Sequence, residues 1–379
     1  MFPFKKIVVT TAFPRDYSKP RGGVETVSVN LVKALAKHKD IEVNVVTFSG
    51  DVGSVQTEIW NDAIIHRLPY TGKKILQFSV GKGRAILKSY IYNLKCDLVH
   101  AHDTYGIMIH GLTLPRIFTV HGFIYEDTRY EKTLSAFIRS LIWEWVEKRS
   151  WAEKPHIISI APYVHDRLRT TVKGKIYNIS NPVDEAFFAV QPKPYGKIIF
   201  TSALLIERKN IIGLLKAFKD LVEVDKEVQL RIAGAAVDTN YKQKIDSFIL
   251  QNGLYKNVFL LGSLSQKEII AELSKTSVYA LVSFEEGAPM GIAEAMAAQI
   301  PIVTSDRCGM PSMVSSNDNG FLVDPLDSVD IMKNLKRILD NAELQRTLGQ
   351  NGRKRALDQY HPDIVANKTL YAYTQLFAS

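Results

Sequence analysis

Residues 277–305 combine two apolar segments, a polar turn and a run of helix formers in an order that strongly constrains the fold. The uncharged residues 277–283 predict a buried strand, and residues 284–289 predict a turn. Residues 290–298 predict a helix with a proline at its start, and residues 300–304 predict the next strand. The unpaired N–H groups at the start of such a helix carry a partial positive charge. This strand–turn–helix–strand unit therefore suits a phosphate or another anion.

Two carboxylates in this unit are candidates for binding hydroxyl groups. Glu286 falls in the turn, and Glu294 falls about one turn into the helix. Both can therefore border one crevice at the carboxyl end of the strand. Ionised carboxylates only accept hydrogen bonds, and they pair with vicinal hydroxyls such as those of a ribose or a hexose. The spacing alone leaves open that Glu286 is an ordinary loop residue and that Glu294 only complements the helix dipole.

The unit resembles the signature of retaining glycosyltransferase family 4, in which two glutamates form an E-x7-E motif. The matching segments are residues 286–290 (EGAPM), 294–297 (EAMA) and 301–305 (PIVTS). The resemblance implies that Glu286 contacts hydroxyls of the donor sugar and that Glu294 contacts the nucleotide ribose. It also implies donor contacts, partly through backbone amides that reach the sugar and the phosphates, by Gly287, Ala288, Pro289, Met290, Gly291 and Ile292.

At 379 residues the chain is too long for one typical core and fits two domains. We predict a first domain at residues 1–190, a second at 191–355 and a last helix at 356–379. In the resembling fold this last helix crosses back to the first domain. The linker is placed at residues 191–196 (QPKPYG), because two prolines and a glycine disfavour both helix and strand.

The composition is that of a cytoplasmic protein with a basic first half. We find no pattern typical of a signal peptide and no run of about 18 apolar residues that would span a membrane. The only cysteines, Cys96 and Cys308, are too few for a disulfide framework. Residues 1–190 hold 26 Lys and Arg against 18 Asp and Glu. This excess indicates an anionic membrane surface or a phosphorylated acceptor, or else charge that only aids solubility. No nucleic-acid-binding signature accompanies it, so a nucleic-acid partner is not expected.

In the first half, Gly22, Gly23 and His121 are candidate site residues. The two glycines lie between a predicted strand at residues 5–11 and a predicted helix at 25–36, where backbone can approach an anion closely. They resemble the N-terminal glycine loop of family 4, which lies near the donor diphosphate and the acceptor. His121 ends the predicted strand at 117–122, and open α/β sheets bind ligands at that end. A histidine here faces the donor sugar and the transfer site in the resembling family.

Two further features of the first half leave alternatives open. The basic amphipathic residues 72–92 are typical of a membrane-surface segment or of an ordinary surface helix that Gly81 and Gly83 interrupt. The tryptophans of the predicted helix at 134–152 indicate core or interdomain packing: Trp143, Trp145 and Trp151. A metal site is not expected from the histidines, because no cysteine or acid accompanies them at the spacing of zinc ligands: His100, His102, His110 and His121.

In the second half, Arg208 and Lys209 follow a predicted strand at residues 197–202 and could hold a diphosphate, although a solvated pair is the alternative. Their loop resembles the family segment that holds the donor diphosphate, with Lys209 at the lysine position. Many family members carry Gly-Arg where this chain has Ala203-Leu204, and Arg208 is the candidate replacement. In the resembling family the predicted strand at residues 258–263 leads to the nucleotide base, which implies donor contacts through backbone groups near Ser263 and Leu264. Gly234, at the end of the predicted strand at residues 228–234, is a further predicted donor contact.

Alternating strands and helices predict two doubly wound, Rossmann-like α/β domains, which by resemblance adopt the GT-B arrangement around a central cleft. We therefore expect a retaining hexosyltransferase that needs no metal or cofactor, with His121, Glu286 and Lys209 as its catalytic residues. Its donor would be a nucleoside diphosphate sugar, with UDP favoured, and its acceptor a glycan or lipid-linked hydroxyl in cell-surface polysaccharide assembly. Peripheral binding to the inner face of the plasma membrane is compatible with the basic first half. A nucleotide-sugar isomerase or epimerase of the same fold, or a catalytically silent nucleotide-sugar-binding protein, remains an alternative.

Overall fold

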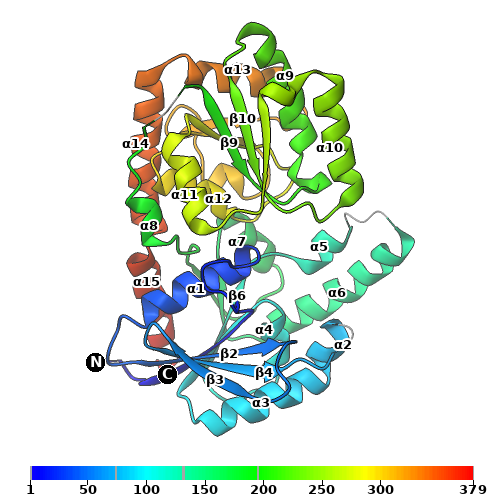
Figure 1. Ribbon diagram of the computed structural model, residues 1–379. Helices are drawn as coiled ribbons and strands as arrows, with labels where there is room; N and C mark the ends of the chain where they lie inside the picture. The colour runs from blue at the N-terminus through cyan, green and yellow to red at the C-terminus, as the bar shows by residue number, and fades with distance from the viewer. Residues whose placement is uncertain (1, 73–74, 130–132, 194–195, 379) are drawn as a thin grey trace. The chain divides into compact units, whose positions relative to one another are not determined.

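A computed structural model of the chain describes residues 2–72, 75–129, 133–193 and 196–378 (Figure 1). The chain divides into two compact units. The first comprises residues 1–182 and 362–379, and the second comprises residues 183–361. Each unit is built on a largely parallel β-sheet with helices in the crossover connections that parallel strands require. The predicted fold class of two doubly wound α/β domains is confirmed.

The first unit contains an eight-stranded sheet in the order β3-β4-β2-β1-β5-β6-β7-β8. Its strands are β1 (Lys6–Thr10), β2 (Glu42–Ser49), β3 (Gln56–Trp60), β4 (Ala63–Pro69), β5 (Leu98–His102), β6 (Arg116–Val120), β7 (His156–Ser159) and β8 (Lys175–Asn178). Its helices are α1 (Gly23–Leu35), α2 (Ile75–Val80), α3 (Lys82–Leu94), α4 (Thr104–Met108), α5 (Ile124–Arg129), α6 (Leu134–Ala152), α7 (Pro162–Leu168) and α15 (Pro362–Thr374). The central strands β1 and β5 are almost wholly buried, as expected for parallel strands covered on both faces. Helix α1 packs against α15, and α4 packs against α2, α3 and α6.

The second unit contains a six-stranded sheet in the order β11-β10-β9-β12-β13-β14. Its strands are β9 (Ile198–Ser202), β10 (Gln229–Ala233), β11 (Val258–Gly262), β12 (Val278–Leu281), β13 (Ile302–Ser305) and β14 (Gly320–Val323). Its α-helices are α8 (Glu185–Phe188), α9 (Ile211–Val224), α10 (Thr239–Gln251), α11 (Gln266–Lys275), α12 (Met290–Ala297), α13 (Ser328–Leu339) and α14 (Ala342–Gln359). The sheet is parallel throughout its described pairs. Helix α9 faces the core with Leu214, Leu215, Phe218 and Leu221, whose spacing places them on one side of the helix.

The strand order reverses once in each sheet, and this reversal positions the candidate residues. In the first unit β1 lies between β2 and β5, and in the second unit β9 lies between β10 and β12. The crossovers leave the two central strands in opposite directions, so a crevice opens at the carboxyl ends of these strands. Segments 11–22 and 103 follow β1 and β5, and segments 203–210 and 282–289 follow β9 and β12. Most of the predicted site residues fall in or beside these four segments.

Three details differ from the sequence-based expectations. A strand predicted within residues 59–68 is present as β4, but the sequence did not indicate β3, which forms an antiparallel hairpin with β4 through Asn61 and Asp62, both at positive φ, as two-residue hairpin turns require. The domain boundaries were predicted at residues 190/191 and 355/356, whereas the units separate at 182/183 and 361/362. The first boundary lies earlier because Phe187 and Phe188 pack into the core of the second unit. Trp143 and Trp151 are buried as predicted, whereas Trp145 is 63% exposed, so the packing interpretation of Trp145 is wrong.

Candidate functional site

Glu286, in the turn after β12, is held by two cations from the 3₁₀ turn η1 (Glu207–Lys209) that follows β9. Lys209 Nζ forms an ion pair with Glu286 Oε1, and Arg208 Nη1 lies 3.5 Å from Glu286 Oε2. Arg208 also donates a hydrogen bond of 2.7 Å to the carbonyl of Glu285. The Glu286 side chain is 9% exposed, and burying a carboxylate is unfavourable unless it is paired in this way. The structure therefore brings together three of the predicted site residues from two distant segments.

Asn210 fixes the loop that carries the two cations. Its backbone adopts the left-handed region with φ 52°, which asparagine tolerates better than most residues. Its side-chain amide donates to the carbonyls of Val282 (3.1 Å) and Pro325 (2.8 Å), and its side-chain oxygen accepts from the N–H of Gly213 to cap α9. The loop is thus tied to the end of β12, directly before the turn that contains Glu286.

Gly309 supports the same turn from the segment after β13. Its N–H donates a hydrogen bond of 2.8 Å to the carbonyl of Glu286. A Cβ at this position would lie 1.6 Å from the carbonyl oxygen of Gly287, so only glycine fits without movement of the backbone. Glu286 is therefore positioned by backbone contacts as well as by its ion pairs.

Glu294 lies about one turn into α12 and is partly buried. Burial, together with the nearby carboxylate of Asp184, raises the pKa of Glu294 to about 7. Tyr279 lies beneath the start of the same helix, where its hydroxyl is 3.0 Å from Ser202 Oγ. A Cβ on Gly291 would lie 2.1 Å from the Tyr279 hydroxyl, so this glycine allows α12 to approach the sheet closely. Burial also raises the pKa of Tyr279, which keeps it a neutral hydrogen-bonding group.

The other predicted donor contacts of the second unit lie further along the same edge of the sheet. Gly234 follows β10, and its N–H donates a hydrogen bond of 2.7 Å to Gly262 at the end of β11. Ser263 and Leu264 follow β11 and precede α11, which begins with a capping box between Ser265 and Glu268. The remaining residues of the predicted set lie in the turn after β12 or in the first turn of α12: Gly287, Ala288, Pro289, Met290, Gly291 and Ile292. Strand ends β9 to β12 thus collect the whole predicted set of this unit.

In the first unit the glycine loop follows β1 as predicted. Gly22 has φ 96°, and α1 begins at the next residue, Gly23. The carbonyl of Gly22 accepts a hydrogen bond of 3.2 Å from the N–H of Thr26 in the first turn of α1. A Cβ on either glycine would meet no described heavy atom within 4 Å, so the backbone of this loop is open to approach.

His121 belongs to a network of buried imidazoles at the ends of β5 and β6. Its Nε2 lies 2.8 Å from Nδ1 of His102, and its N–H lies 3.4 Å from Asp103 Oδ1. His100, two residues before His102, contacts Tyr373 of α15 (2.7 Å) and Thr119 of β6 (2.6 Å) through its two ring nitrogens. Burial lowers the pKa of His102 and His121, and it lowers the pKa of His100 to about 3. The network is therefore neutral at physiological pH.

A small pocket opens beside these imidazoles and contains groups that sequence reasoning did not assign to the site. His102 Nε2 is buried with no hydrogen-bond partner, and His102 lines the pocket with His121 and Asn181. A hydrogen bond with Asn181 favours the protonated form of His121 and partly opposes the effect of burial. Asn181 opens the segment Asn181-Pro182-Val183-Asp184, to which no role was assigned from the sequence. No signal in the sequence assigns a role to His102 either.

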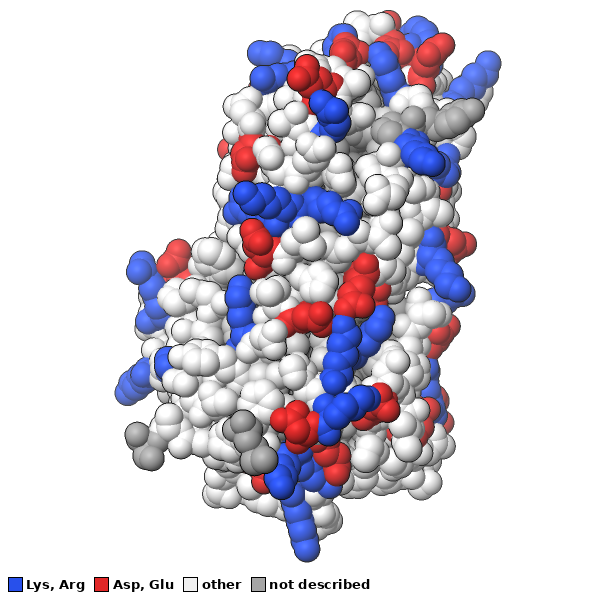
Figure 2. Space-filling model, turned by 90° about the vertical axis from the view of Figure 1, so that its left-hand side faces the viewer, with Lys and Arg blue, Asp and Glu red and all other residues white. Residues whose placement is uncertain are grey.

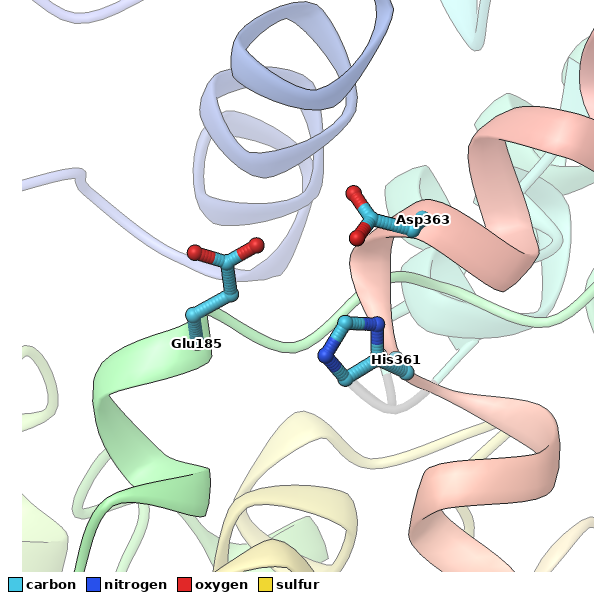
Figure 3. A group of neighbouring side chains, drawn as sticks. All are labelled: Glu185, His361 and Asp363. Atoms are coloured by element: carbon cyan, nitrogen blue, oxygen red, sulfur yellow. The ribbon is translucent and has the colours of Figure 1, made fainter. Parts of the chain in front are cut away.

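Figure 3 shows Glu185, His361 and Asp363, which offer atom types that can bind a metal ion and lie where the chain passes between the two units. Within the second unit, the His361 ring lies 5.1 Å from the ring of Phe188. Within the first unit, Asp363 forms an ion pair of 2.8 Å with Lys37. We assign no metal site to these side chains, because exposed acidic groups often gather without an ion.

The charges on the surface do not indicate a further binding site on the face shown in Figure 2. Figure 2 shows a face on which Lys and Arg side chains are mixed with Asp and Glu side chains, without a continuous field of one sign. Among the described ion pairs, several on the surface join residues that are each more than one-third exposed, such as Lys39 with Asp62. Such exposed pairs contribute little free energy, so the buried group around Glu286 is the more informative one.

Comparison with known proteins places the two halves in two related family models. Residues 183–355 match the model for glycosyl transferases group 1, and residues 21–187 match that for glycosyltransferase family 4. An uncharacterized glycosyltransferase of Methanocaldococcus jannaschii is 25% identical over 355 residues, which cover 92% of this chain and 93% of that protein. The glycosyltransferase EpsD of Bacillus subtilis is 30% identical over 299 residues, covering 72% and 74%.

Solved structures show the same fold. Sucrose-phosphate synthase from Thermosynechococcus elongatus superposes with a TM-score of 0.79 at 21% identity, covering 99% of both chains. HepE of Anabaena, solved in complex with UDP-glucose, superposes with a TM-score of 0.73 at 16% identity, covering 99% of this chain and 100% of that one. These likenesses establish the GT-B fold.

Proposed function

Because the chain belongs to the glycosyl transferases group 1 and to glycosyltransferase family 4, we propose that it transfers a hexose from a UDP-sugar to a glycan or lipid-linked hydroxyl, with retention of the anomeric configuration. The observation that carries this proposal is the buried carboxylate of Glu286, held by Lys209 and Arg208 at the strand-order reversal of the second unit. Open α/β sheets bind their ligands at this point.

The second unit supplies the groups that a nucleoside diphosphate sugar requires. Lys209 and Arg208 can neutralise the diphosphate, and the N–H groups at the start of α12 add partial positive charge. Glu294, when ionised, can accept hydrogen bonds from the ribose hydroxyls. UDP is the favoured nucleotide because a structural neighbour of the same fold, HepE, was solved with UDP-glucose. The two cations supply the charge that a divalent metal supplies elsewhere, so the proposed reaction needs no metal.

The ion pairs also bear on the role of Glu286. A carboxylate engaged by Lys209 and approached by Arg208 is a weak nucleophile, so we assign it to orienting the sugar hydroxyls. In the proposed step the acceptor oxygen forms a bond to the anomeric carbon on the face from which the diphosphate oxygen departs. The acceptor proton passes to that diphosphate oxygen. The cations stabilise the charge that develops on the leaving diphosphate.

The first unit is proposed to bind the acceptor and to present His121 to the transferred sugar, the role that the family resemblance gives. A neutral imidazole is suited to this role, because it can donate or accept one hydrogen bond without attracting the diphosphate. The tautomer of His121 is constrained by its contact with His102 and by Asn181. The excess of basic residues in residues 1–190 favours an acceptor that carries phosphate or is anchored in an anionic membrane.

A panel of donors tests the proposal directly. Purified protein is mixed with UDP-, GDP- and ADP-sugars, and the melting temperature and slow nucleotide release are measured. We expect one UDP-sugar to raise the melting temperature by linkage and to be hydrolysed slowly in the absence of acceptor. The Glu286→Gln variant should bind that donor more weakly and hydrolyse it more slowly.

Other outcomes of the panel select the alternatives. Conversion of the sugar without release of nucleotide would indicate an isomerase or epimerase. Binding without turnover, even with candidate acceptors present, would indicate a silent binder. Near-normal transfer by the Glu286→Gln variant would contradict the role given to Glu286.

A further inference from the structure

Helix α6 exposes apolar side chains and buries polar ones, the reverse of a helix in a soluble protein. The exposed residues, which we call the α6 stripe, are between 46% and 76% accessible to solvent: Leu134, Phe137, Ile138, Leu141, Ile142 and Trp145. The residues buried on the same helix include three polar ones: Ala136, Ser140, Trp143, Glu147, Ser150 and Trp151. Successive members of the stripe are one or three residues apart, so they lie on one face of the helix.

The orientation of α6 is fixed by polar contacts of its buried face. The carboxylate of Glu147 accepts hydrogen bonds from the N–H groups of Ile124 (3.2 Å) and Tyr125 (3.1 Å), which begin α5. Ser150 Oγ donates to the carbonyl of Gly106 in α4 at 3.5 Å, and the ring of Trp151 packs 5.6 Å from that of Phe123. Rotation of the helix to bury the stripe would leave Glu147 exposed and α5 uncapped. The stripe is therefore a feature of the folded unit.

A group of cations lies beyond the carboxyl end of the stripe. Arg149 lies over the ring of Trp145, with its guanidinium carbon 5.6 Å from the ring centroid. Lys154 is nearly buried, and its pKa falls to about 7 through burial and through the charges of Arg116 and Arg84. From α3, Lys88 Nζ donates to the carbonyl of Gly111 (2.9 Å), next to the end of α4.

Arg139, Lys148 and Arg149 are exposed on α6, and the acid among them, Glu144, is less exposed and pairs with Lys148. Glu153 forms ion pairs with His110 and, at 3.8 Å, with Arg149. Residues 70–96, which contain α2 and α3, include no Asp or Glu. Arg149 thus places positive charge beside Trp145, at the carboxyl end of the α6 stripe. Charge of this sign beside a row of large apolar side chains is the pattern of a surface that lies on an anionic bilayer.

We propose that the α6 stripe docks on the surface of an anionic lipid bilayer, with its apolar side chains among the acyl chains and with Trp145 and Arg149 at the level of the headgroups. A helix lying in the interface buries an apolar face of this kind, and tryptophan beside arginine is suited to the boundary between hydrocarbon and water. Among the described helices none is both long enough and apolar enough to cross the membrane. The docking is therefore peripheral.

This surface differs from the segment that the sequence indicated. Residues 73–74 lie outside the described residues, and the helices α2 and α3 that follow bury Phe78, Leu87 and Ile91, whereas three other large apolar side chains are 41–46% exposed: Ile75, Val80 and Tyr92. The membrane-surface interpretation of that segment stays a prediction. The inference goes beyond the proposed reaction, since lipid binding needs neither donor nor acceptor and is measured without them.

Co-sedimentation of the full chain with vesicles tests the proposal. The vesicles contain phosphatidylcholine alone or phosphatidylcholine mixed with phosphatidylglycerol. The stripe is changed by Phe137→Ser together with Trp145→Ser. The matched control is Val237→Ser together with Leu250→Ser in the second unit, where the two side chains are 62% and 74% exposed. A third variant, Arg149→Gln, removes one cation beside the stripe.

We expect wild type and control to bind the anionic vesicles equally, and to bind neutral vesicles more weakly. The stripe variant should partition about a hundredfold more weakly, or roughly tenfold for each large apolar side chain withdrawn from the bilayer. Arg149→Gln should weaken binding to anionic vesicles about fivefold and leave binding to neutral vesicles unchanged. All variants should melt at the wild-type temperature, because no changed side chain is part of a core.

Several outcomes would overturn the proposal. Wild type could fail to bind anionic vesicles, or the control could lose as much binding as the stripe variant. Equal binding of wild type to neutral and anionic vesicles would exclude the assigned charge complementarity. Light scattering that shows a wild-type dimer and a monomeric stripe variant would assign the stripe to contact with a second copy of the chain instead.

Discussion

The two units reverse their strand order in the same way, yet the residues at the two reversals differ in charge. In the first unit the reversal at β1 and β5 brings an open glycine loop and buried imidazoles to the edge of the sheet. In the second unit the reversal at β9 and β12 brings two cations and a buried carboxylate to that edge. The first edge is neutral near the histidines, and the second is strongly polar and held by ion pairs.

The comparison shows that topology determines where a ligand binds, whereas local side chains determine which ligand fits. A diphosphate requires fixed positive charge, and the second unit offers it in Lys209 and Arg208, beside the buried carboxylate of Glu286. A neutral polar edge is better suited to sugar hydroxyls, which are poor ligands for an isolated cation. The division of labour proposed for the two units follows from this difference.

The largest effect is expected from removing a cation of the second unit. Lys209→Met should lower kcat/KM by about a thousandfold, because the charge on the leaving diphosphate loses a preorganised partner. Steady-state kinetics with the donor found in the panel measure the change. Lys244→Met is the control, since Lys244 pairs with Glu207 of the same 3₁₀ turn but is 60% exposed. A loss of less than tenfold for Lys209→Met would place the diphosphate elsewhere.

A smaller effect, on stability, is expected from the backbone that supports Glu286. Gly309→Ala introduces a Cβ that would lie 1.6 Å from the carbonyl oxygen of Gly287, so the turn must move. We expect a loss of about 3 kcal/mol, which lowers the melting temperature of a unit of this size by roughly 6–12 °C. Gly122→Ala, next to His121 in the first unit, is the matched control, because its Cβ would meet nothing within 4 Å. Equal melting temperatures for the two variants would show that the turn is not rigidly supported.

The two edges were not equally predictable from sequence. The strand ends that carry Glu286, Lys209 and Gly234 follow from apolar runs and turn residues. The E-x7-E resemblance assigned the role of Glu286, and the resemblance of the loop at residues 203–210 assigned that of Lys209. The contact of Lys209 with Glu286 joins residues 77 positions apart and could be expected only from the strand order. In the first unit, His121 was found through its place at a strand end, whereas its contact with His102 depends on the register between β5 and β6.

The remaining errors have physical causes that local patterns do not contain. The hairpin of β3 and β4 depends on two residues at positive φ, Asn61 and Asp62, within a run that resembles one long strand. Trp145 was expected to pack because large aromatic side chains usually do. Trp145 is exposed because Glu147 and Ser150, on the opposite face of α6, make polar contacts that turn that face inward. Sequence periodicity alone would place this polar face toward solvent.

A pH effect should arise in the second unit and not in the first. The pKa of Glu294 is raised to about 7, so the ionised fraction of this carboxyl group falls as the pH drops from 8 to 6. Because the ionised form is the one proposed to accept hydrogen bonds from the ribose, donor affinity should fall by up to about tenfold per pH unit below pH 7. Burial lowers the pKa values of His100, His102 and His121 in the first unit, so these three imidazoles stay neutral over this range. Donor titrations at several pH values measure the effect. The Glu294→Gln variant should bind weakly at every pH, and a wild-type affinity independent of pH would contradict the assignment.

The raised pKa of Glu294 also affects the stability of the fold, which should fall as the pH rises, whereas donor affinity should rise. The folded-state pKa of Glu294 lies above its ordinary value of 4.5, so the folded protein binds more protons between these values than the unfolded chain. Stability therefore falls as the pH rises from 4.5 through 7. Above pH 7, Glu294→Gln should be more stable than wild type, by at most about 3 kcal/mol. Unfolding midpoints at pH 8 test this gain, which would accompany the loss of donor binding.

The smallest effect is expected at the neutral edge, where a hydrogen bond between the imidazoles of His102 and His121 helps to position His121. Asparagine at position 102 can place an amide near the position of His102 Nδ1, whereas leucine cannot form the bond. His102→Leu should therefore lower kcat about tenfold with little change in the donor KM, and His102→Asn should restore most of the rate. Similar melting temperatures would show that both variants fold, since leucine also removes the unpartnered Nε2 from the interior. If the two variants have equal activity, the bond between the imidazoles serves only the packing of the first unit. The neutral edge would then contribute shape rather than orientation to the reaction.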